Sequence, residues 1–334
     1  MAVWSEPAGV NLCGDTGQQF ADRILETLPG LRNDERLLRN LRRELPQLAE
    51  AAPGPLLSAL ELMLEGDGAL IRPIFEEKEG LLFPRSYHTG LLWALETLAW
   101  DPTYFRRAVH VLSKLATIDP GGKLTNRPLN SLAEVFLPWS PNTNAAAPLR
   151  LAVLGEIASQ DSNVGWDLIA RLLPTVHGTS FPTAKPRLRE AGAAERPPVT
   201  DRALEEMQGA VVDMALNLAG SEGSRWDRLL RGYSLFPAAQ RGRLVGDLDR
   251  VLAMLEPFEQ EALWTSLRDE VARHQRFASA AWAMRPDDLA PLVNLVERYA
   301  PADPLEPVVY LFDNWSLDGA GSLRGCLTTL TRTA

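Results

Sequence analysis

Two helix-turn-helix units that resemble each other constrain the fold of this chain most. One spans residues 91–116 and the other residues 149–173, and apolar residues recur at helical spacing in both. Leu154 and Ile157 correspond to Leu95 and Leu98 at the same offset of 59 residues (154 − 95). Recurring helical pairs stack on one another and usually form binding surfaces. The sequence therefore predicts an all-α protein, an α-solenoid of HEAT/armadillo-like helical pairs with irregular insertions.

Irregular stretches divide the predicted solenoid into regions. Residues 1–176 form an N-terminal helical-repeat region, with an insertion at 119–144 that is rich in Pro, Gly and Asn. Residues 177–200 contain four prolines and no apolar periodicity. We expect this proline-rich excursion to be a linker or an ordered loop that packs across the helices and carries binding. Residues 201–334 form a C-terminal helical-repeat region.

Start and stop signals refine the expected helices. Asp34 is placed to cap a helix, and Pro46 splits residues 34–48 into two short helices. Gly220 closes a helix that has an apolar seam from Leu204 to Leu218. The only run of strand character is residues 308–312, which we interpret as a helix or packed extended segment because one strand cannot pair alone. The ending at 326–334 has no obvious cap and suggests a piece of a longer polypeptide.

Composition excludes several classes of function. The chain has 334 residues, a formal net charge of −9, 46% hydrophobic and 23% charged residues, so a folded core is expected and no global field attracts nucleic acid. Two distant cysteines support neither a disulfide framework nor a zinc site. The first residues do not form a signal peptide, and no run of apolar residues is long enough to cross a membrane. We therefore expect a cytoplasmic location without membrane attachment.

The sequence contains only weak matches to phosphate-binding and metal-binding motifs. Residues 120–125 have the glycines of a phosphate loop, but no strand precedes them and Leu124 separates Lys123 from Thr125, which favours a tight inter-helix turn. The four histidines show no metal-ligand spacing, so we predict no metal and no cofactor. We expect His88 and His274 to be unremarkable, and His110 to lie on a solvated basic edge with Arg106 and Lys114.

An enzyme is the alternative interpretation. His177 opens the proline-rich excursion close to Ser180, and a hydrolase-type enzyme would use a loop-covered pocket around His177. Asp161 or Glu190 would assist this histidine as the second titratable group. The hypothesis requires a His177 that is buried or paired with a carboxylate.

Aromatic and acidic residues have structural interpretations. Trp139 ends a helix and is expected to anchor the insertion onto the stack, or to anchor a partner. The acidic stretch at Glu76 and Glu77 indicates a solvated helix end. Five further tryptophans fall on helices and are predicted to be packing wedges: Trp93, Trp100, Trp166, Trp226 and Trp264.

Three stretches support a resemblance to a known family: residues 118–132, residues 135–139, and residues 173–177 through 182–187. Together they resemble the helical region of large bacterial STAND-type NTPase antiphage-defence proteins, over roughly residues 85–190. In that family an NTPase core and an effector supply activity while helical repeats sense a partner. The chain lacks a Walker A loop, so the resemblance implies a sensor or scaffold segment of a larger multidomain protein whose NTPase or effector domains lie elsewhere.

The leading hypothesis is a non-enzymatic protein-interaction module whose insertion and excursion decorate one face of the stack. Its expected partner is a protein; the net charge argues against nucleic acid. The polar and aromatic partner-binding residues predicted from these segments are Asn126, Arg127, Asn130, Trp139, His177, Lys185 and Arg187.

Overall fold

The structure is a computed structural model that describes residues 16–77, 86–189 and 198–301. Within these ranges every regular element is a helix and no strand occurs, which confirms the prediction of an all-α protein. Contacts divide the chain into two compact units, residues 1–218 with 235–240, and residues 219–234 with 241–334. The division thus falls near the end of α10 (Asp201–Ala219) and not at the proline-rich excursion. Residues 308–312, with their ambiguous apolar run, lie outside the described ranges.

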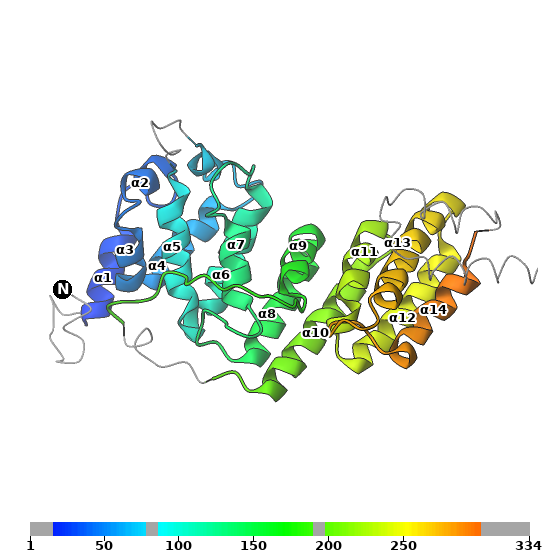
Figure 1. Cartoon of the computed structure of the whole chain (residues 1–334). Coiled ribbons are helices and arrows are strands. Elements are labelled where there is room, and N and C mark those ends of the chain that lie inside the picture. The colour runs from blue at the N-terminus through cyan, green and yellow to red at the C-terminus, as the bar shows by residue number, and fades with distance from the viewer. Residues whose placement is uncertain (1–15, 78–85, 190–197, 302–334) are drawn as a thin grey trace, which may run out of the picture. The chain divides into compact units, whose positions relative to one another are not determined.

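The first unit contains most of the helices, which Figure 1 shows in chain order from blue to green. Besides α10 they are α1 (Gly17–Glu26), α2 (Glu35–Asn40), α3 (Leu45–Ala51), α4 (Pro53–Met63), the 3-10 helix η2 (Arg72–Phe75), α5 (His88–Ala99), α6 (Pro102–Ile118), α7 (Pro128–Phe136), α8 (Ala147–Gln160) and α9 (Ser162–Leu172).

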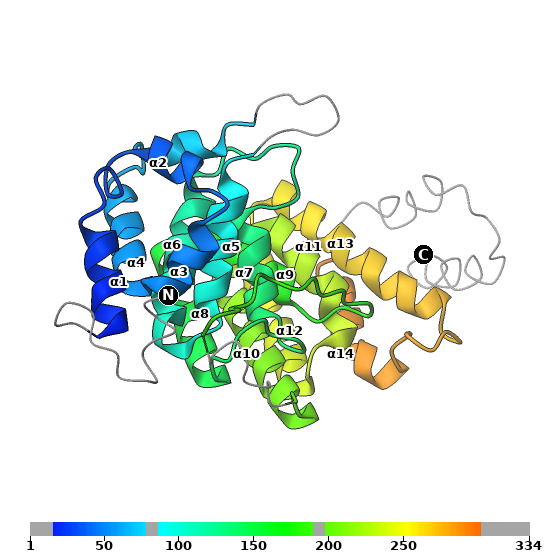
Figure 2. The ribbon, with the colours of Figure 1, turned by 90° about the vertical axis from the view of Figure 1, so that its left-hand side faces the viewer.

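Neighbouring contacts arrange these helices in two rows. In one row α3 contacts α5, α5 contacts α7, and α7 contacts α9. In the other row α4 contacts α6, and α6 contacts α8. The rows meet through contacts of α3 with α4, α5 with α6, and α8 with α9, and α1 packs on α3 and α4 at one end (Figures 1 and 2). Helices of one row are therefore alternate elements of the chain.

Local capping explains where several of these helices begin. Thr16 and Gln19 form a capping box at α1, in which each side chain accepts a hydrogen bond from the other residue's backbone N–H. Asp34 caps α2 as predicted, and Asp101 and Asp161 cap α6 and α9 in the same way. The first four N–H groups of a helix lack helical partners, so these side chains stabilise each start.

Proline and glycine act at the predicted places. Pro46 lies in the first turn of α3, and residues 34–48 do form two short helices, α2 and α3. Gly220 follows α10 with φ 56°, the left-handed conformation that ends helices. Gly121 also has a positive φ, 76°, and its N–H donates to Asp119 Oδ1 at 3.0 Å, so residues 120–125 belong to an inter-helix loop as predicted.

The core of the first unit depends on one close approach of backbone to backbone. A Cβ atom built on Gly90 would lie 1.7 Å from the carbonyl oxygen of Arg42, so the start of α5 tolerates only glycine at this position. The apolar face of α5 that follows Gly90 is buried: Leu91, Leu95 and Leu98 are all buried, as their spacing predicts.

The second unit has its own core. It contains α11 (Gly223–Gly232), most of η4 (Tyr233–Leu235), most of α12 (Ala238–Met254), α13 (Pro257–Arg276) and α14 (Pro286–Arg298). Helix α13 contacts both α11 and α14, and it buries Leu263, Leu267 and Val271. His274 is also completely buried on α13, which the sequence analysis did not anticipate. Its Nδ1 accepts from the N–H of Met284 at 3.2 Å, so its Nε2 carries the proton that faces Glu270.

The tryptophan prediction is partly confirmed. Trp100, Trp226 and Trp264 are buried, and Trp166 is half-buried. Trp93 is 49% exposed on α5, so its interpretation as a packing wedge is wrong.

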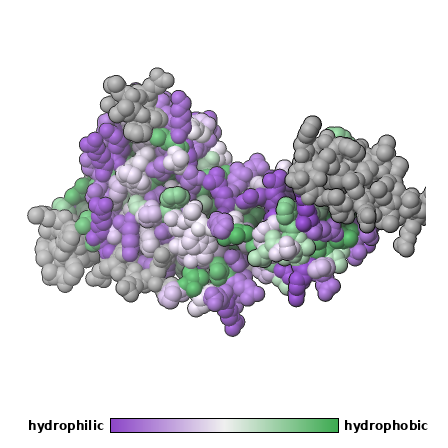
Figure 3. All heavy atoms as spheres, in the orientation of Figure 1, coloured by the Kyte–Doolittle hydropathy of each residue, from purple (hydrophilic) through white to green (hydrophobic). Residues whose placement is uncertain are grey.

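Surface chemistry is mixed. On the face shown in Figure 3, hydrophilic and hydrophobic residues alternate in small patches among the coloured atoms. The predicted basic edge of α6 is partly paired, because Arg106 and His110 both contact the carboxylate of Glu156 on α8. Among the described helices, none combines the length and apolar character needed to cross a membrane.

Candidate functional site

An extended segment lies across the row of α3, α5 and α7. We call residues 177–189 the strap; they form no helix and run from the end of α9 back toward α1, as Figure 1 shows. Three glutamates hold the strap, one from each helix it crosses: Glu134 on α7, Glu96 on α5 and Glu50 on α3. The prediction of an ordered loop that packs across the helices is therefore confirmed for residues 177–189, while residues 190–197 lie outside the described ranges.

Glu134 holds the first part of the strap. Its Oε2 accepts from the backbone N–H of Phe181 at 2.9 Å and from the Ser180 hydroxyl at 3.2 Å. The Asn142 amide donates to the Phe181 carbonyl oxygen at 3.3 Å, so Phe181 is bound through both of its backbone groups. Its ring plays no part in this fastening.

Glu96 holds the middle of the strap from a buried position. Its Oε2 accepts from the N–H of Ala184 at 2.8 Å, and its Oε1 accepts from the Ser131 hydroxyl of α7 at 2.6 Å. Burial raises the pKa of the Glu96 carboxyl, and the nearby negative charge of Glu134 acts in the same direction. A buried carboxylate is costly unless it is hydrogen-bonded, and one of its two donors belongs to the strap.

Glu50 holds the last part of the strap. Its Oε2 accepts from three successive backbone N–H groups, those of Arg187, Leu188 and Arg189, at 2.9, 2.7 and 3.2 Å. Consecutive N–H groups that converge on one oxygen form an anion-binding nest. Because Glu50 is itself buried, this nest compensates the loss of its water.

Side chains add further fastenings. The indole N–H of Trp100 donates to the Thr183 hydroxyl at 3.2 Å, and the Lys185 ammonium lies 5.0 Å from the Trp100 ring centre. Pro186 is buried. Arg189 donates to the backbone oxygen of Glu50 and to Gln18 Oε1 on α1. Through Arg189 the strap thus connects α1 to α3, the helix at the N-terminal end of the row.

The outward side of the strap is apolar and cationic. Val176, just before it, is 64% exposed, and Phe181 and Leu188 are 68% and 40% exposed. Lys185 and Arg187 are exposed between and beside them. Large apolar side chains with this exposure serve as anchors when a partner covers them.

A polar pocket of about 420 Å³ lies at the beginning of the strap. Trp139, Arg171, His177, Thr179 and Gln208 are among its lining residues. A Cβ atom on Gly178 would lie 2.9 Å from the Trp139 indole, so the strap backbone packs directly against this ring. Trp139 is 38% exposed and therefore keeps part of its surface for other contacts.

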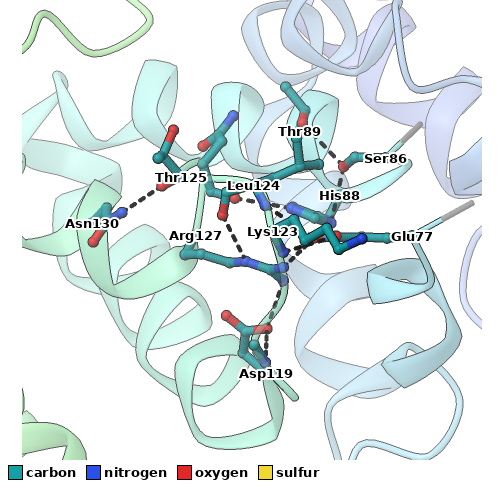
Figure 4. Close-up of polar contacts among 12 residues, drawn as sticks. Glu77, Ser86, His88, Thr89, Asp119, Lys123, Leu124, Thr125, Arg127 and Asn130 are labelled. Carbon is teal, nitrogen blue, oxygen red and sulfur yellow. Dashed lines mark hydrogen bonds and ion pairs between the residues drawn. The ribbon is translucent and has the colours of Figure 1, made fainter. Parts of the chain in front are cut away.

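A second polar cluster closes the loop of residues 119–127, and Figure 4 shows it. Arg127 is 8% exposed and donates to Glu77, to Asp119 Oδ1 at 3.0 Å and to the Leu124 carbonyl oxygen at 3.2 Å. Glu77 also accepts from the N–H groups of Lys123 and Leu124. Burial alone would raise the pKa of the Glu77 carboxyl, but these N–H groups and the charge of Arg127 hold it below its ordinary value. Glu77 is therefore a loop fastener, and its interpretation as a solvated helix end is wrong.

His88, at the start of α5, binds the same loop through the backbone of Asn126. It is fully buried, and its Nε2 lies 2.9 Å from the Asn126 carbonyl oxygen, which can only accept. Nε2 therefore carries the proton, and Nδ1 accepts from the Ser86 hydroxyl at 3.0 Å (Figure 4). Burial lowers the pKa of His88, so the neutral ring is the stable form. The expectation that His88 is unremarkable is wrong.

The predicted partner-binding residues fall into two groups. Arg127 and Asn126 belong to the closed loop: Arg127 is buried, and Asn126 binds His88 through its carbonyl oxygen. Asn130, in the first turn of α7, binds the Thr125 carbonyl oxygen of this loop and also accepts from Arg171. Four others lie on the strap or beside it: Trp139, His177, Lys185 and Arg187. The structure brings the second group together along one segment, whereas it places the first group in structural roles.

Of the two conditions set for the enzyme alternative, the burial of His177 is not met. His177 is exposed. Asp161 caps α9 and accepts from the Thr117 hydroxyl, so its oxygens are engaged, and Glu190 lies outside the described residues. Among the described residues no group of three or more His, Cys, Asp or Glu side chains is arranged to hold a metal ion.

Sequence reasoning missed the three glutamates that hold the strap. Each lies in the last turn of its helix, where the partial negative charge of the helix end disfavours a carboxylate. This repeated violation of a helix preference is a signal that the sequence contains, but only the strap explains it. Comparison of the chain with models of protein families, with curated proteins and with solved structures finds no match.

Proposed function

We propose that this protein is a non-enzymatic protein-interaction module built as a short α-solenoid of HEAT-like helical pairs. The two rows of alternating helices support this proposal, because stacked pairs generate such rows. The face that carries the strap is the proposed recognition face. The observation that carries the proposal is a strap whose backbone is fastened inward while Phe181, Leu188 and Arg187 project outward.

The proposed role is that of a sensor or scaffold. The resemblance of residues 85–190 to helical regions of bacterial STAND-type antiphage proteins supports this role, with the remaining domains of such a protein supplying activity. A chain with two distant cysteines fits a cytoplasmic location. The partner we propose is a protein with acidic residues beside an apolar surface, which would complement Lys185, Arg187 and Phe181.

Site-specific photo-crosslinking tests this assignment. A photoreactive residue replaces Phe181 in one protein and Leu62, which is exposed on α4, in another. We expect a partner adduct of defined mass at position 181 and none at position 62. The double variant Phe181→Ala/Arg187→Ala keeps every backbone N–H of the strap and should lower partner co-purification at least about tenfold, as loss of two anchor residues does.

Exposed residues outside the strap provide the matched control. Leu62→Ala/Arg36→Ala removes one apolar and one cationic side chain from elsewhere in the same unit. This control should bind the partner like the wild type. Equal crosslinking at positions 62 and 181, or unchanged co-purification of the strap variant, would show that the recognition face is elsewhere.

A further inference from the structure

The carboxylates of the three glutamates bind the strap mainly through its backbone N–H groups, and the Ser180 hydroxyl is the one strap side chain described as donating to these carboxylates. Glu134 accepts from the N–H of residue 181, Glu96 from that of residue 184, and Glu50 from those of residues 187 to 189. The first donors of the three sites are therefore three residues apart. Pro182 and Pro186, which have no N–H to donate, fall between the donor positions.

This spacing matches the spacing of packed helices. Neighbouring helices lie about 8–10 Å apart. A polyproline-type extended chain advances about 9 Å in three residues and completes one turn, so every third N–H points the same way. A segment of that conformation presents one donor to each helix of the row α7, α5 and α3. The match depends on backbone geometry and would apply to any extended segment with donors at these positions.

The two buried carboxylates, those of Glu50 and Glu96, need hydrogen-bond donors from a polypeptide that covers them. Glu50 and Glu96 are 4% and 6% exposed, and both sit at helix ends whose partial charge repels them. Their burial is compensated by backbone N–H groups of the strap together with the Ser131 hydroxyl. Cations also flank the donors, since Lys185, Arg187 and Arg189 belong to the strap. The row therefore favours an extended, basic, proline-containing segment.

We propose that Glu50, Glu96 and Glu134 form a binding track for an extended polypeptide, and that the strap is a built-in occupant which a partner's basic, proline-containing segment replaces. This inference rests on the proposed function and adds to it: the acidic and apolar surface of the same partner holds the released strap through Lys185, Arg187 and Phe181, while a basic, proline-containing segment of that partner occupies the track. Replacement is feasible because few strap side chains are buried: Pro186 is buried, whereas Phe181, Pro182, Lys185, Arg187 and Leu188 are exposed.

A labelled synthetic peptide of residues 177–189 tests the track. Its binding is measured by fluorescence anisotropy against the full chain and against a full-length strap-replaced variant. In that variant proline takes the place of the five donor residues (181, 184 and 187–189), so the tethered segment has no N–H to offer the three glutamates. The tethered strap acts at an effective concentration of the order of millimolar. We therefore expect the peptide to bind the strap-replaced variant at least about tenfold more tightly than the wild type.

Backbone methylation distinguishes the track from unspecific adhesion. A peptide N-methylated at Ala184 loses the donor to Glu96, whereas one N-methylated at Lys185 keeps all five backbone donors to the three glutamates. We expect the first to bind at least about tenfold more weakly than the second, the loss that one buried charge-assisted hydrogen bond causes. The glutamates are tested in the strap-replaced variant by the triple substitution Glu50→Gln/Glu96→Gln/Glu134→Gln. It should also weaken binding of the unmodified peptide at least about tenfold.

A single substitution keeps the test valid if the strap-replaced variant does not fold. Ala184→Pro in the otherwise intact chain removes only the central donor, and circular dichroism checks its helices. We expect this variant to bind the peptide where the wild type does not. Equal peptide binding to the folded variant and the wild type, or equal effects of methylation at 184 and 185, would overturn the track.

The two proposals fail separately. The peptide experiment uses no partner, so its failure together with a partner adduct at position 181 leaves the interaction module intact and makes the strap purely structural. If the wild type instead forms dimers at high concentration that the free peptide dissociates, the occupant is the strap of a second copy and not a partner's segment.

Discussion

At the scale of single residues, the buried histidine of the first unit makes stability depend on pH. The unfolded chain protonates His88 near its ordinary pKa of about 6.5, whereas burial lowers the pKa of the folded form. The stabilisation is therefore complete above about pH 6.5 and is lost progressively as the pH falls. We expect the wild type to lose about 1 kcal/mol of unfolding free energy between pH 7.5 and 5.5 through this group.

Denaturant unfolding of His88→Gln at both pH values checks this expectation. The variant should lose the part of the pH dependence that His88 contributes, while His177→Gln at an exposed position should keep it. Burial also lowers the pKa of His274 in the second unit, and that contribution remains in both variants. Glu96 acts in the opposite sense, because a raised folded pKa gives stability that is lost as the pH rises through it. Glu96 is present in both proteins, so its contribution cancels when the wild type and His88→Gln are compared. An equal change of unfolding free energy between pH 7.5 and 5.5 in the two proteins would contradict the role given to His88.

Glycine at position 90 is a second residue-scale requirement. Gly90→Ala places a Cβ 1.7 Å from the Arg42 carbonyl oxygen, so the backbone must move, at a cost of about 1–3 kcal/mol. Gly155→Ala on α8 meets only Met214 Cε at 4.0 Å and should be neutral or stabilise by up to about 1 kcal/mol. Thermal unfolding of the two variants should therefore shift in opposite directions or by clearly different amounts.

At the scale of elements, the loop of residues 119–127 depends on one arginine. Arg127→Ala leaves the Glu77 and Asp119 carboxylates without their cation in a site where both are largely buried. We expect a loss of about 3 kcal/mol and faster hydrogen exchange at the loop amides. Lys123→Ala removes an exposed side chain but keeps the N–H bound to Glu77, so it should change stability by less than about 0.5 kcal/mol.

Elements differ in how well their sequence predicts them. Helices such as α6 and α9 follow from apolar spacing and from Asp101 and Asp161 at their starts, since these signals are local. The strap is predictable only as an irregular segment. Its path depends on Glu50 and Glu96, which are 137 and 88 residues away from their backbone donors. No local pattern encodes such pairings, and for the same reason Arg127 looks like a surface residue in the sequence.

At the scale of the whole molecule, each of the two units has a core of its own. Leu267→Ala on α13 opens a cavity in the second unit and should cost about 2–5 kcal/mol there. Leu95→Ala on α5 should do the same in the first unit. Hydrogen exchange read by mass spectrometry should show each loss of protection confined to the unit that carries the substitution, and a loss spread over both would contradict independent cores.

The molecular division also shows where sequence reasoning stops. The predicted boundary follows the proline-rich segment, because prolines interrupt helical periodicity. In the structure that segment binds back onto the first unit, and α10 stays with the same unit. Composition detects where a helix cannot continue, but it does not show whether the chain leaves the domain or returns to it.

The return of the strap to α1 has a consequence for biosynthesis. Arg189 meets Gln18 across 171 residues, so the first helices leave the ribosome long before their last tie exists. Until then Glu50 and Glu96 lack their backbone donors from the strap. The face formed by α3, α5 and α7 is therefore completed only after residue 189 has been synthesised, although all three helices are made before it.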